Sequence, residues 1–206
     1  MVKVKVCGMT DMSLVPLLNK LTPDYVGFIL TAGFRRSVSE EFVKNFSSRL
    51  SPAIRRVGVF VNDDVCRIAR MVGEGIIDAV QLHGDEDGEY IQKLKSLTPV
   101  AVIKAVGVEG GRAESYPENC DMVLLDAYDK VARGGTGRRI EWRRYPEITK
   151  PVILAGGITP ENVCEAVSLV RPWGVDASGG VERDGKKDID KIRDYILKAR
   201  ECNYGK

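Results

Sequence analysis

Histidine is nearly absent from this chain of 206 residues, since His83 is the single one. An imidazole-rich metal site is therefore nearly excluded. No apolar run approaches the ~20 residues that a membrane-spanning helix needs. The net charge is only +2, from 31 basic and 29 acidic residues, so no overall field favours nucleic acid or a membrane surface. We expect neither as a partner.

The cysteines are few, and their spacing contains no pair motif. They number five, an odd count without a C-x-x-C pair, and stand at Cys7, Cys66, Cys120, Cys164 and Cys202. This usage predicts neither a disulfide framework nor a zinc site, and it favours a reducing compartment. The first residues, MVKVKVCG, also lack the continuous apolar stretch of a signal peptide. The expected location is the cytoplasm.

Short runs rich in Val, Ile and Leu recur along the chain and predict eight strands. They lie at 2–8, 25–30, 55–61, 79–84, 100–108, 122–127, 151–157 and 174–180. Most are apolar with little alternation, which is typical of parallel strands buried on both faces. Amphipathic segments between them predict helices at 39–50, 63–75, 87–97, 159–172 and 188–201. The segment 110–119 is too broken for an ordinary helix.

Eight alternating units leave two architectures open, a closed barrel or an open doubly wound sheet. The number favours an α/β fold of the (β/α)8 TIM-barrel type with a short or degenerate fifth helix. The hydrophobic content of 44% suffices for one substantial core. Since no linker or composition break interrupts the chain, we expect one domain over residues 1–206.

The carboxyl ends of the strands would form the active site of such a barrel. The last two strands end in LAGGIT and DASGG, where glycine lets backbone N–H groups approach phosphate oxygens closely. Either motif alone is also compatible with a tight turn. Together they predict a phosphate site built from Gly156, Gly157, Ser178, Gly179 and Gly180.

A nucleotide-binding loop is a competing interpretation of the segment 180–187. Its sequence, GVERDGKK, is one residue short of the G-x-x-x-x-G-K-[ST] pattern, and Lys187 stands where the magnesium-binding hydroxyl belongs. The sequence therefore disfavours nucleotide hydrolysis.

Cys7 and Asp126 are the expected acid–base pair, because each ends an apolar strand at the same mouth of the barrel. A buried structural thiol and a loop-capping carboxylate are the alternatives. An ordinary thiol with a pKa of ~8.5 is only a few per cent ionised at neutral pH, so Cys7 needs help. We expect it from a helix N-terminus at Thr10–Asp11. Asp126 must instead stay protonated near pH 7.

Several motifs, in order, resemble those of the phosphoribosylanthranilate isomerase family across nearly the whole chain. They are VKVCGMT, YVGFI, VGVFVN, VQLHG, LLDA with GGTG and Trp142 downstream, LAGGITPENV, and GVDASGGVE followed by Gly185 and Lys187–Asp188. The resemblance implies an Amadori rearrangement of N-(5'-phosphoribosyl)anthranilate to 1-(2-carboxyphenylamino)-1-deoxyribulose 5-phosphate in tryptophan biosynthesis, without cofactor or metal. It implies that Asp126 is the general acid and Cys7 the general base.

The resemblance also assigns residues that bind substrate. Arg36 matches the arginine that receives the anthranilate carboxylate, although Phe34 and Ser37 depart from the S-x-R-[YF] pattern around it. Gln81 and His83 are expected to line the site. The GGTG segment at 134–137 is expected to close over substrate or to be a plain connection. Lys104 is either a core-lining lysine or a phosphate helper.

Other phosphosugar barrels remain alternatives. An enzyme like indole-glycerol-phosphate synthase would need a lysine acid, for which only Lys104 is available. A pentose-phosphate epimerase would need a metal site, which a single histidine argues against. A non-catalytic phosphate-binding barrel would leave Cys7 and Asp126 replaceable. The sequence is compatible with a monomer or a homodimer.

Overall fold

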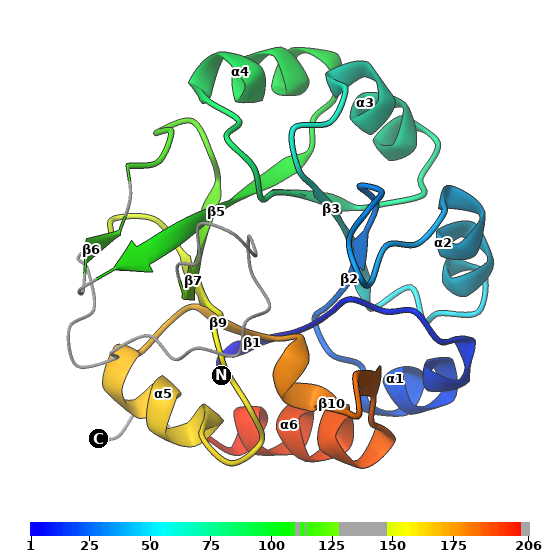
Figure 1. The fold of residues 1–206 in the computed structure, drawn as a ribbon, viewed down its shortest axis with the longest axis vertical. Helices are drawn as coiled ribbons and strands as arrows, with labels where there is room; N and C mark the ends of the chain where they lie inside the picture. The colour runs from blue at the N-terminus through cyan, green and yellow to red at the C-terminus, as the bar shows by residue number, and fades with distance from the viewer. Residues whose placement is uncertain (110–111, 114, 128–147, 203–206) are drawn as a thin grey trace.

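Parallel strands close into a ring in the structure, a computed structural model that describes residues 1–109, 112–113, 115–127 and 148–202 (Figure 1). The ring contains β1 (Lys3–Cys7), β2 (Tyr25–Ile29), β3 (Arg55–Phe60), β4 (Ala79–Leu82), β5 (Ala101–Glu109), β7 (Met122–Ala127), β8 (Val152–Leu154) and β9 (Gly174–Ala177). Pairing of β1 with β9 and of β4 with β5 leaves no open edge in the ring. The predicted (β/α)8 barrel is confirmed, and the open sheet was the wrong alternative.

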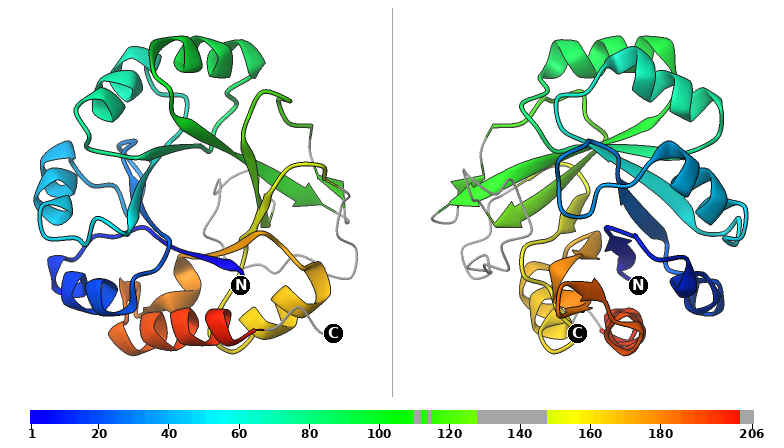
Figure 2. Two further views of the ribbon diagram at one scale, coloured as in Figure 1. Left: turned by 180° about the vertical axis from the view of Figure 1, so that it is seen from behind. Right: turned by 45° about the vertical axis from the view of Figure 1, so that its right-hand side comes forward.

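Helices surround the barrel (Figure 2). They are α1 (Val15–Leu21), α2 (Glu40–Ser47), α3 (Val65–Gly73), α4 (Gly88–Leu97), α5 (Val163–Val170) and α6 (Ile189–Glu201). Four of them begin where a side chain accepts a hydrogen bond from the backbone N–H three residues later, at Ser39, Asp64, Asp87 and Asp188. The helices predicted from periodicity are confirmed, with their ends trimmed by a few residues.

No helix separates β5 from β7 in the described part of that segment. The chain instead forms β6 (Arg112–Ala113), which pairs antiparallel with the end of β5, and then a turn before Cys120. The degenerate fifth unit predicted from the broken sequence at 110–119 is thus confirmed. The GGTG segment at 134–137 and Trp142 lie outside the described residues.

Two apolar layers hold the barrel together, one inside the ring and one between the ring and the helices. The inner layer includes Val57, Ile103, Leu124 and Ile153, whereas Val4 and Val6 of β1 pack in the outer layer. Because side chains alternate along a strand, Lys5 and Cys7 point into the barrel. The alternation at the start of the sequence therefore places one charge and one thiol inside.

The structure corrects the expectation that no disulfide forms. Cys164 in α5 and Cys202, which follows α6, are joined by a disulfide with a Cα–Cα distance of 5.2 Å. Cysteine spacing gave no signal of this bond, because the two residues are 38 positions apart and meet only when α6 packs beside α5. Cys7, Cys66 and Cys120 remain free thiols.

Reduction of this disulfide should destabilise the protein without changing the fold. A bond across 38 residues limits the unfolded chain, so its loss should lower the free energy of unfolding by about 2–4 kcal/mol. The measurement is urea unfolding with and without a reductant, followed by circular dichroism. Cys202→Ser is the matched control. Its free energy of unfolding should equal that of the reduced wild-type protein and should not change when reductant is added. An unchanged midpoint for the reduced wild-type protein would contradict the prediction.

Candidate active site

A small open pocket of about 60 Å³ lies at the carboxyl ends of β7, β8 and β9. Its walls are Asp126, Ala155, Gly156, Gly157, Ile158, Asp176, Ser178, Gly179 and Gly180. The structure thus brings the predicted acid and all five predicted phosphate-site residues into one pocket. Asp176 belongs to the same pocket and was not anticipated.

The glycines of the pocket are required by backbone geometry. Gly156 and Gly157 have φ values of 74° and 72°, which other residues adopt only with strain. A Cβ on Gly180 would lie 1.9 Å from the Ile158 carbonyl oxygen, so only glycine lets the two loops approach. The N–H groups of Gly157, Gly179 and Gly180 donate to no acceptor within the described part of the chain. Such free amides are suited to an anion.

Cys7 ends β1 beside this pocket and is 6% exposed. The space for its sulfur comes from Gly27 on β2, where a Cβ would lie 2.6 Å from Sγ. Gly8 then turns the chain with a φ of 77°, and a Cβ there would lie 2.7 Å from Arg36 Cδ. The Ser178 hydroxyl donates to the Cys7 carbonyl at 3.1 Å. Three loops therefore meet around the thiol.

The electrostatics of Cys7 differ from the expectation. Burial raises the pKa of the Cys7 thiol above its ordinary value, and Asp176 raises it further, although Lys5 and Lys187 oppose the rise. The predicted lowering by a helix N-terminus was wrong. Asp11 caps only the short 3-10 helix η1 (Met12–Leu14), and the desolvation of a nearly fully buried thiol dominates.

A buried ion pair lies beneath the thiol. Lys5 Nζ donates to Asp176 Oδ2 at 2.9 Å, with side-chain exposures of 1% and 7%. Although burial opposes it, the attraction of Asp176 and Cys7 raises the pKa of Lys5, so the lysine stays charged. Neither residue was predicted as functional. The available signal was a charged residue two positions from Cys7, on the inward side of a buried strand.

Gln81 and His83, which the sequence predicts to line the site, are not among the walls of this pocket but form a chain of contacts that reaches Asp126. Gln81 Nε2 lies 2.9 Å from His83 Nδ1, and His83 Nε2 lies 3.8 Å from Asp126 Oδ2. All three side chains stand at inward positions, on β4, just beyond it and on β7. The imidazole therefore faces the carboxyl from the side opposite the glycine loops.

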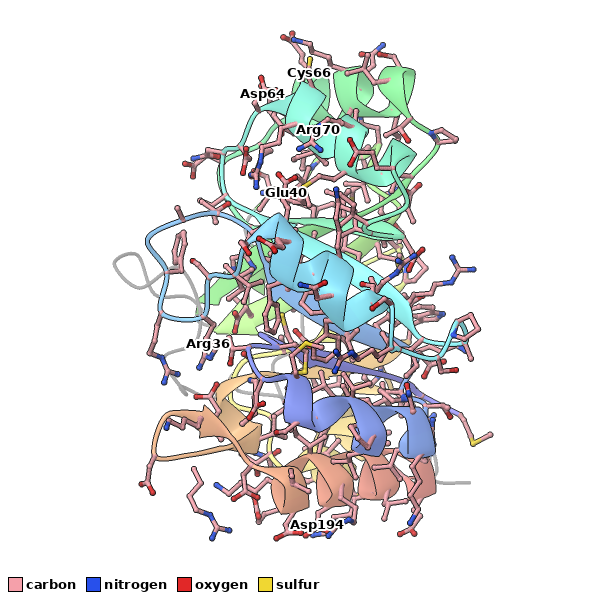
Figure 3. All side chains as sticks on the ribbon, turned by 90° about the vertical axis from the view of Figure 1, so that its right-hand side faces the viewer. Arg36, Glu40, Asp64, Cys66, Arg70 and Asp194 are labelled. Atoms are coloured by element: carbon pink, nitrogen blue, oxygen red, sulfur yellow. A yellow bond between two sulfur atoms is a disulfide. The ribbon has the colours of Figure 1, made fainter. Side chains whose placement is uncertain are left out.

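Arg36 lies at the rim, on the loop before α2 (Figure 3). Its Nε and Nη2 donate to the two carboxylate oxygens of Glu182, at 2.5 and 3.1 Å. Lys187 Nζ, from the strand opposite, donates to Glu182 Oε1 at 3.1 Å and to the Ser178 carbonyl at 2.8 Å. Burial alone would raise the pKa of Glu182, but Arg36, Lys187 and Arg35 lower it to about 2. This carboxylate, which sequence reasoning missed, orients the rim cations.

Ser37 and Phe34 depart from the S-x-R-[YF] pattern around Arg36, but the loop that contains them is still held by hydrogen bonds. The Ser37 hydroxyl donates to the Thr31 carbonyl at 2.6 Å and accepts from the Phe34 N–H at 3.1 Å. Ser37 also forms a β-bridge with Ile29. The loop is closed on itself, and Arg36 is presented toward the β9 side of the mouth.

Lys104 does not face the pocket. It alternates with the inward Ile103, and its Nζ donates to the Gly84 carbonyl at 2.6 Å and to Glu86 Oε2 at 3.0 Å. Both side chains of this ion pair are buried. Of the two alternatives, a structural lysine is confirmed, and it supports the loop after β4.

The segment 180–187 is not a nucleotide-binding loop. It completes the 3-10 helix η3 (Gly179–Val181) and continues as an antiparallel hairpin of β10 (Glu182–Arg183) and β11 (Lys186–Lys187). In the described ranges, no three His, Cys, Asp or Glu side chains are grouped to hold a metal ion. None of the described helices has the length and apolar character to cross a membrane.

Comparisons with known proteins point to one family. Residues 4–198 match the model for N-(5'phosphoribosyl)anthranilate (PRA) isomerase. A relative of that name from Clostridium acetobutylicum is 40% identical over 207 residues, covering 98% of this chain and 99% of its own.

Solved structures of this kind are also similar. One is phosphoribosyl anthranilate isomerase in complex with reduced 1-(o-carboxyphenylamino)-1-deoxyribulose 5-phosphate, with a TM-score of 0.78, 33% identity and coverage of 98% and 100% of the two chains. Another is a set of generated monomers of the dimeric enzyme from Thermotoga maritima, with a TM-score of 0.78, 34% identity and the same coverage.

Replacement of Lys187 by methionine should make Cys7 less reactive. Lys187 lowers the pKa of the thiol, so its loss should move the pH midpoint of alkylation upward and slow alkylation several-fold at neutral pH. The measurement is the rate of iodoacetamide labelling of Cys7 against pH, by mass spectrometry. Lys186→Met, which changes an exposed lysine on the same strand, should leave the profile unchanged. Equal profiles for the two variants would contradict the assignment.

Proposed function

Because the chain belongs to the N-(5'-phosphoribosyl)anthranilate isomerase family, we propose that Cys7 and Asp126 are the base and the acid of its isomerisation. The reaction is the Amadori rearrangement of N-(5'-phosphoribosyl)anthranilate to 1-(2-carboxyphenylamino)-1-deoxyribulose 5-phosphate, a step of tryptophan biosynthesis. One observation supports the residue assignment above others. The side chains of Cys7 and Asp126 both point into the barrel, from the carboxyl ends of β1 and β7. They lie on either side of a pocket that is lined by free glycine amides.

Both anionic groups of the substrate have matching partners in this proposal. The phosphate binds the free amides of Gly157, Gly179 and Gly180, with Gly156 and Ser178 shaping the loops that present them. The anthranilate carboxylate approaches Arg36, whose planar guanidinium Glu182 holds at the rim. Anchoring at both ends suspends the ribose between Asp126 and Cys7.

Asp126 acts first, as general acid. It protonates the ring oxygen of the furanose, which opens to a Schiff base. The negative charge of bound phosphate and anthranilate carboxylate favours the protonated carboxyl. His83, at 3.8 Å, and Gln81 behind it orient Asp126 and line this side of the site.

Cys7 acts second, as general base. Its thiolate removes the proton from C2' of the Schiff base, and the resulting enolamine tautomerises to the ketone. The raised pKa of the thiol makes the thiolate a stronger base but a scarcer one. The neighbouring cations Lys5 and Lys187 favour the thiolate form of Cys7, so they partly offset the effect of burial.

The same proposal covers partners and location. The partner is the small phosphorylated substrate, and the protein is a monomer or a homodimer, as both forms of a related enzyme are known. A strongly anionic substrate does not cross membranes and must be isomerised where it is made, which supports the cytoplasm. A single domain over residues 1–206 is part of the proposal.

Cys7→Ala and Asp126→Asn should each slow turnover severely while retaining binding. Loss of a general acid or base typically costs about 10²- to 10⁴-fold in rate. The measurement is the fluorescence decrease of phosphoribosylanthranilate generated in the cuvette. For the wild type, kcat/KM should rise with pH through the raised Cys7 pKa.

Cys66→Ala is the matched control, because this thiol is exposed on α3, and it should retain wild-type rates. A wild-type protein without isomerase activity would overturn the function. Normal rates in both site variants would overturn only the residue assignment.

Arg36→Met should raise KM more than it lowers kcat. A charge-assisted contact with the anthranilate carboxylate is worth roughly 10- to 100-fold in affinity. The measurement is steady-state kinetics for this variant beside Arg35→Met, whose side chain is 56% exposed and also bonded to Glu182. Because Arg35 is held by Glu182 and the Gly185 carbonyl and has no proposed contact with substrate, its loss should change KM by only a few-fold. Equal effects of the two substitutions would contradict a direct contact by Arg36.

A further inference from the structure

One buried acceptor in the pocket has no hydrogen-bond partner among the described residues. Asp176 is 6% exposed, and its Oδ2 accepts from Lys5, but its Oδ1 is buried and accepts no hydrogen bond from any residue that the structure describes. Leaving a buried carboxylate oxygen unpaired is costly, so native proteins rarely do it without a reason. The same side chain forms part of the wall of the pocket that contains Asp126 and the glycine loops.

We propose that Asp176 contacts the substrate directly, with Oδ1 accepting a hydrogen bond from a hydroxyl of its ribosyl chain. This inference rests on the proposed function, because it takes that substrate as the occupant of the pocket. It makes Asp176 a substrate-binding residue in addition to the acid, the base and the phosphate loops.

The chemistry of the substrate selects the hydroxyl. An ionised carboxylate only accepts hydrogen bonds, and it repels the phosphate and the anthranilate carboxylate. The phosphate is bound at the glycine amides and the ring oxygen is reached by Asp126, so the part of the substrate between them faces Asp176. Apart from its anilino N–H, the donors that the substrate carries are the ribosyl hydroxyls on C2' and C3', which lie on the sugar ring beside these two groups.

Lys5 keeps this acceptor in place. Its ammonium, on the neighbouring strand β1, donates a hydrogen bond to Oδ2 at 2.9 Å, and the pairing register sets Lys5 beside Asp176. Because Lys5 holds Oδ2, the carboxylate of Asp176 cannot rotate freely and the direction of Oδ1 is fixed as well. A mere counter-ion for Lys5 needs only Oδ2, which leaves the unpaired Oδ1 beside the pocket unexplained.

Binding measurements on Asp176→Asn test the contact. In this variant the amide oxygen must face the Lys5 ammonium, so the amide NH₂ group turns toward the pocket and a donor replaces the acceptor. Affinity for reduced 1-(o-carboxyphenylamino)-1-deoxyribulose 5-phosphate, measured by calorimetry, should fall about 10- to 100-fold. Affinity for inorganic phosphate, which has no sugar hydroxyl, should not fall. Asp190→Asn, an exposed change on α6, is the control and should match the wild type for both ligands.

A double variant separates contact from counter-ion. Lys5→Met with Asp176→Leu replaces the buried pair by apolar side chains and leaves no unpaired charge. If Asp176 contacts the substrate, the double variant should still bind the analogue weakly, and it should bind inorganic phosphate with the affinity of the wild type. Three outcomes would each overturn the proposal. The double variant could recover wild-type affinity for the analogue, Asp176→Asn could bind the analogue like the wild type, or the variants could lose affinity for phosphate as well as for the analogue.

Failure of this inference is distinguishable from failure of the proposed function. Turnover by the wild type and analogue binding by Cys7→Ala test the function without involving Asp176. If both are as expected and Asp176→Asn binds the analogue normally, only the contact is wrong. If the wild type neither turns over substrate nor binds the analogue, the function itself is wrong.

Discussion

The buried ion pair between Lys5 and Asp176 ties the first strand of the barrel to the last. A charge in this interior is tolerable only when it is paired, so the pair fixes the register between β1 and β9. A slip of one residue would turn the lysine into the outer apolar layer. With the register fixed, Cys7 lies two residues beyond Lys5 and Ser178 two beyond Asp176. The thiol and the loop at Ser178–Gly180 therefore lie at the same end of the barrel.

Close backbone approach is the second constraint on the site. Gly27 leaves room for the Cys7 sulfur, Gly8 admits Arg36, and Gly180 lets the last two loops touch. Each glycine replaces a Cβ that would collide with a neighbour, so the site is built by removing side chains as much as by adding them. The free amides that result are suited to binding an anion.

The cations of the site are paired with carboxylates, although at the rim Arg36 and Lys187 share a single one. Lys5 is paired with Asp176, while Arg36 and Lys187 share Glu182. These carboxylates keep the cations charged and oriented, whereas burial of Cys7 raises the pKa of its thiol. In the proposed reaction, a doubly anchored anionic substrate brings its negative charge toward cations that are already in place.

The sequence by itself determined the barrel, its broken fifth unit and the identity of most of the pocket. Strand runs and helix caps are local signals, and the ends of parallel strands must meet in a closed ring, so Asp126 and the glycines could be placed without coordinates. Only the tertiary structure decided what surrounds Cys7. Lys5, Asp176 and Glu182 act through partners more than 140 positions away, and Cys164 meets Cys202 only across packed helices. Burial and pairing of this kind are set by three-dimensional neighbours, which no local pattern encodes.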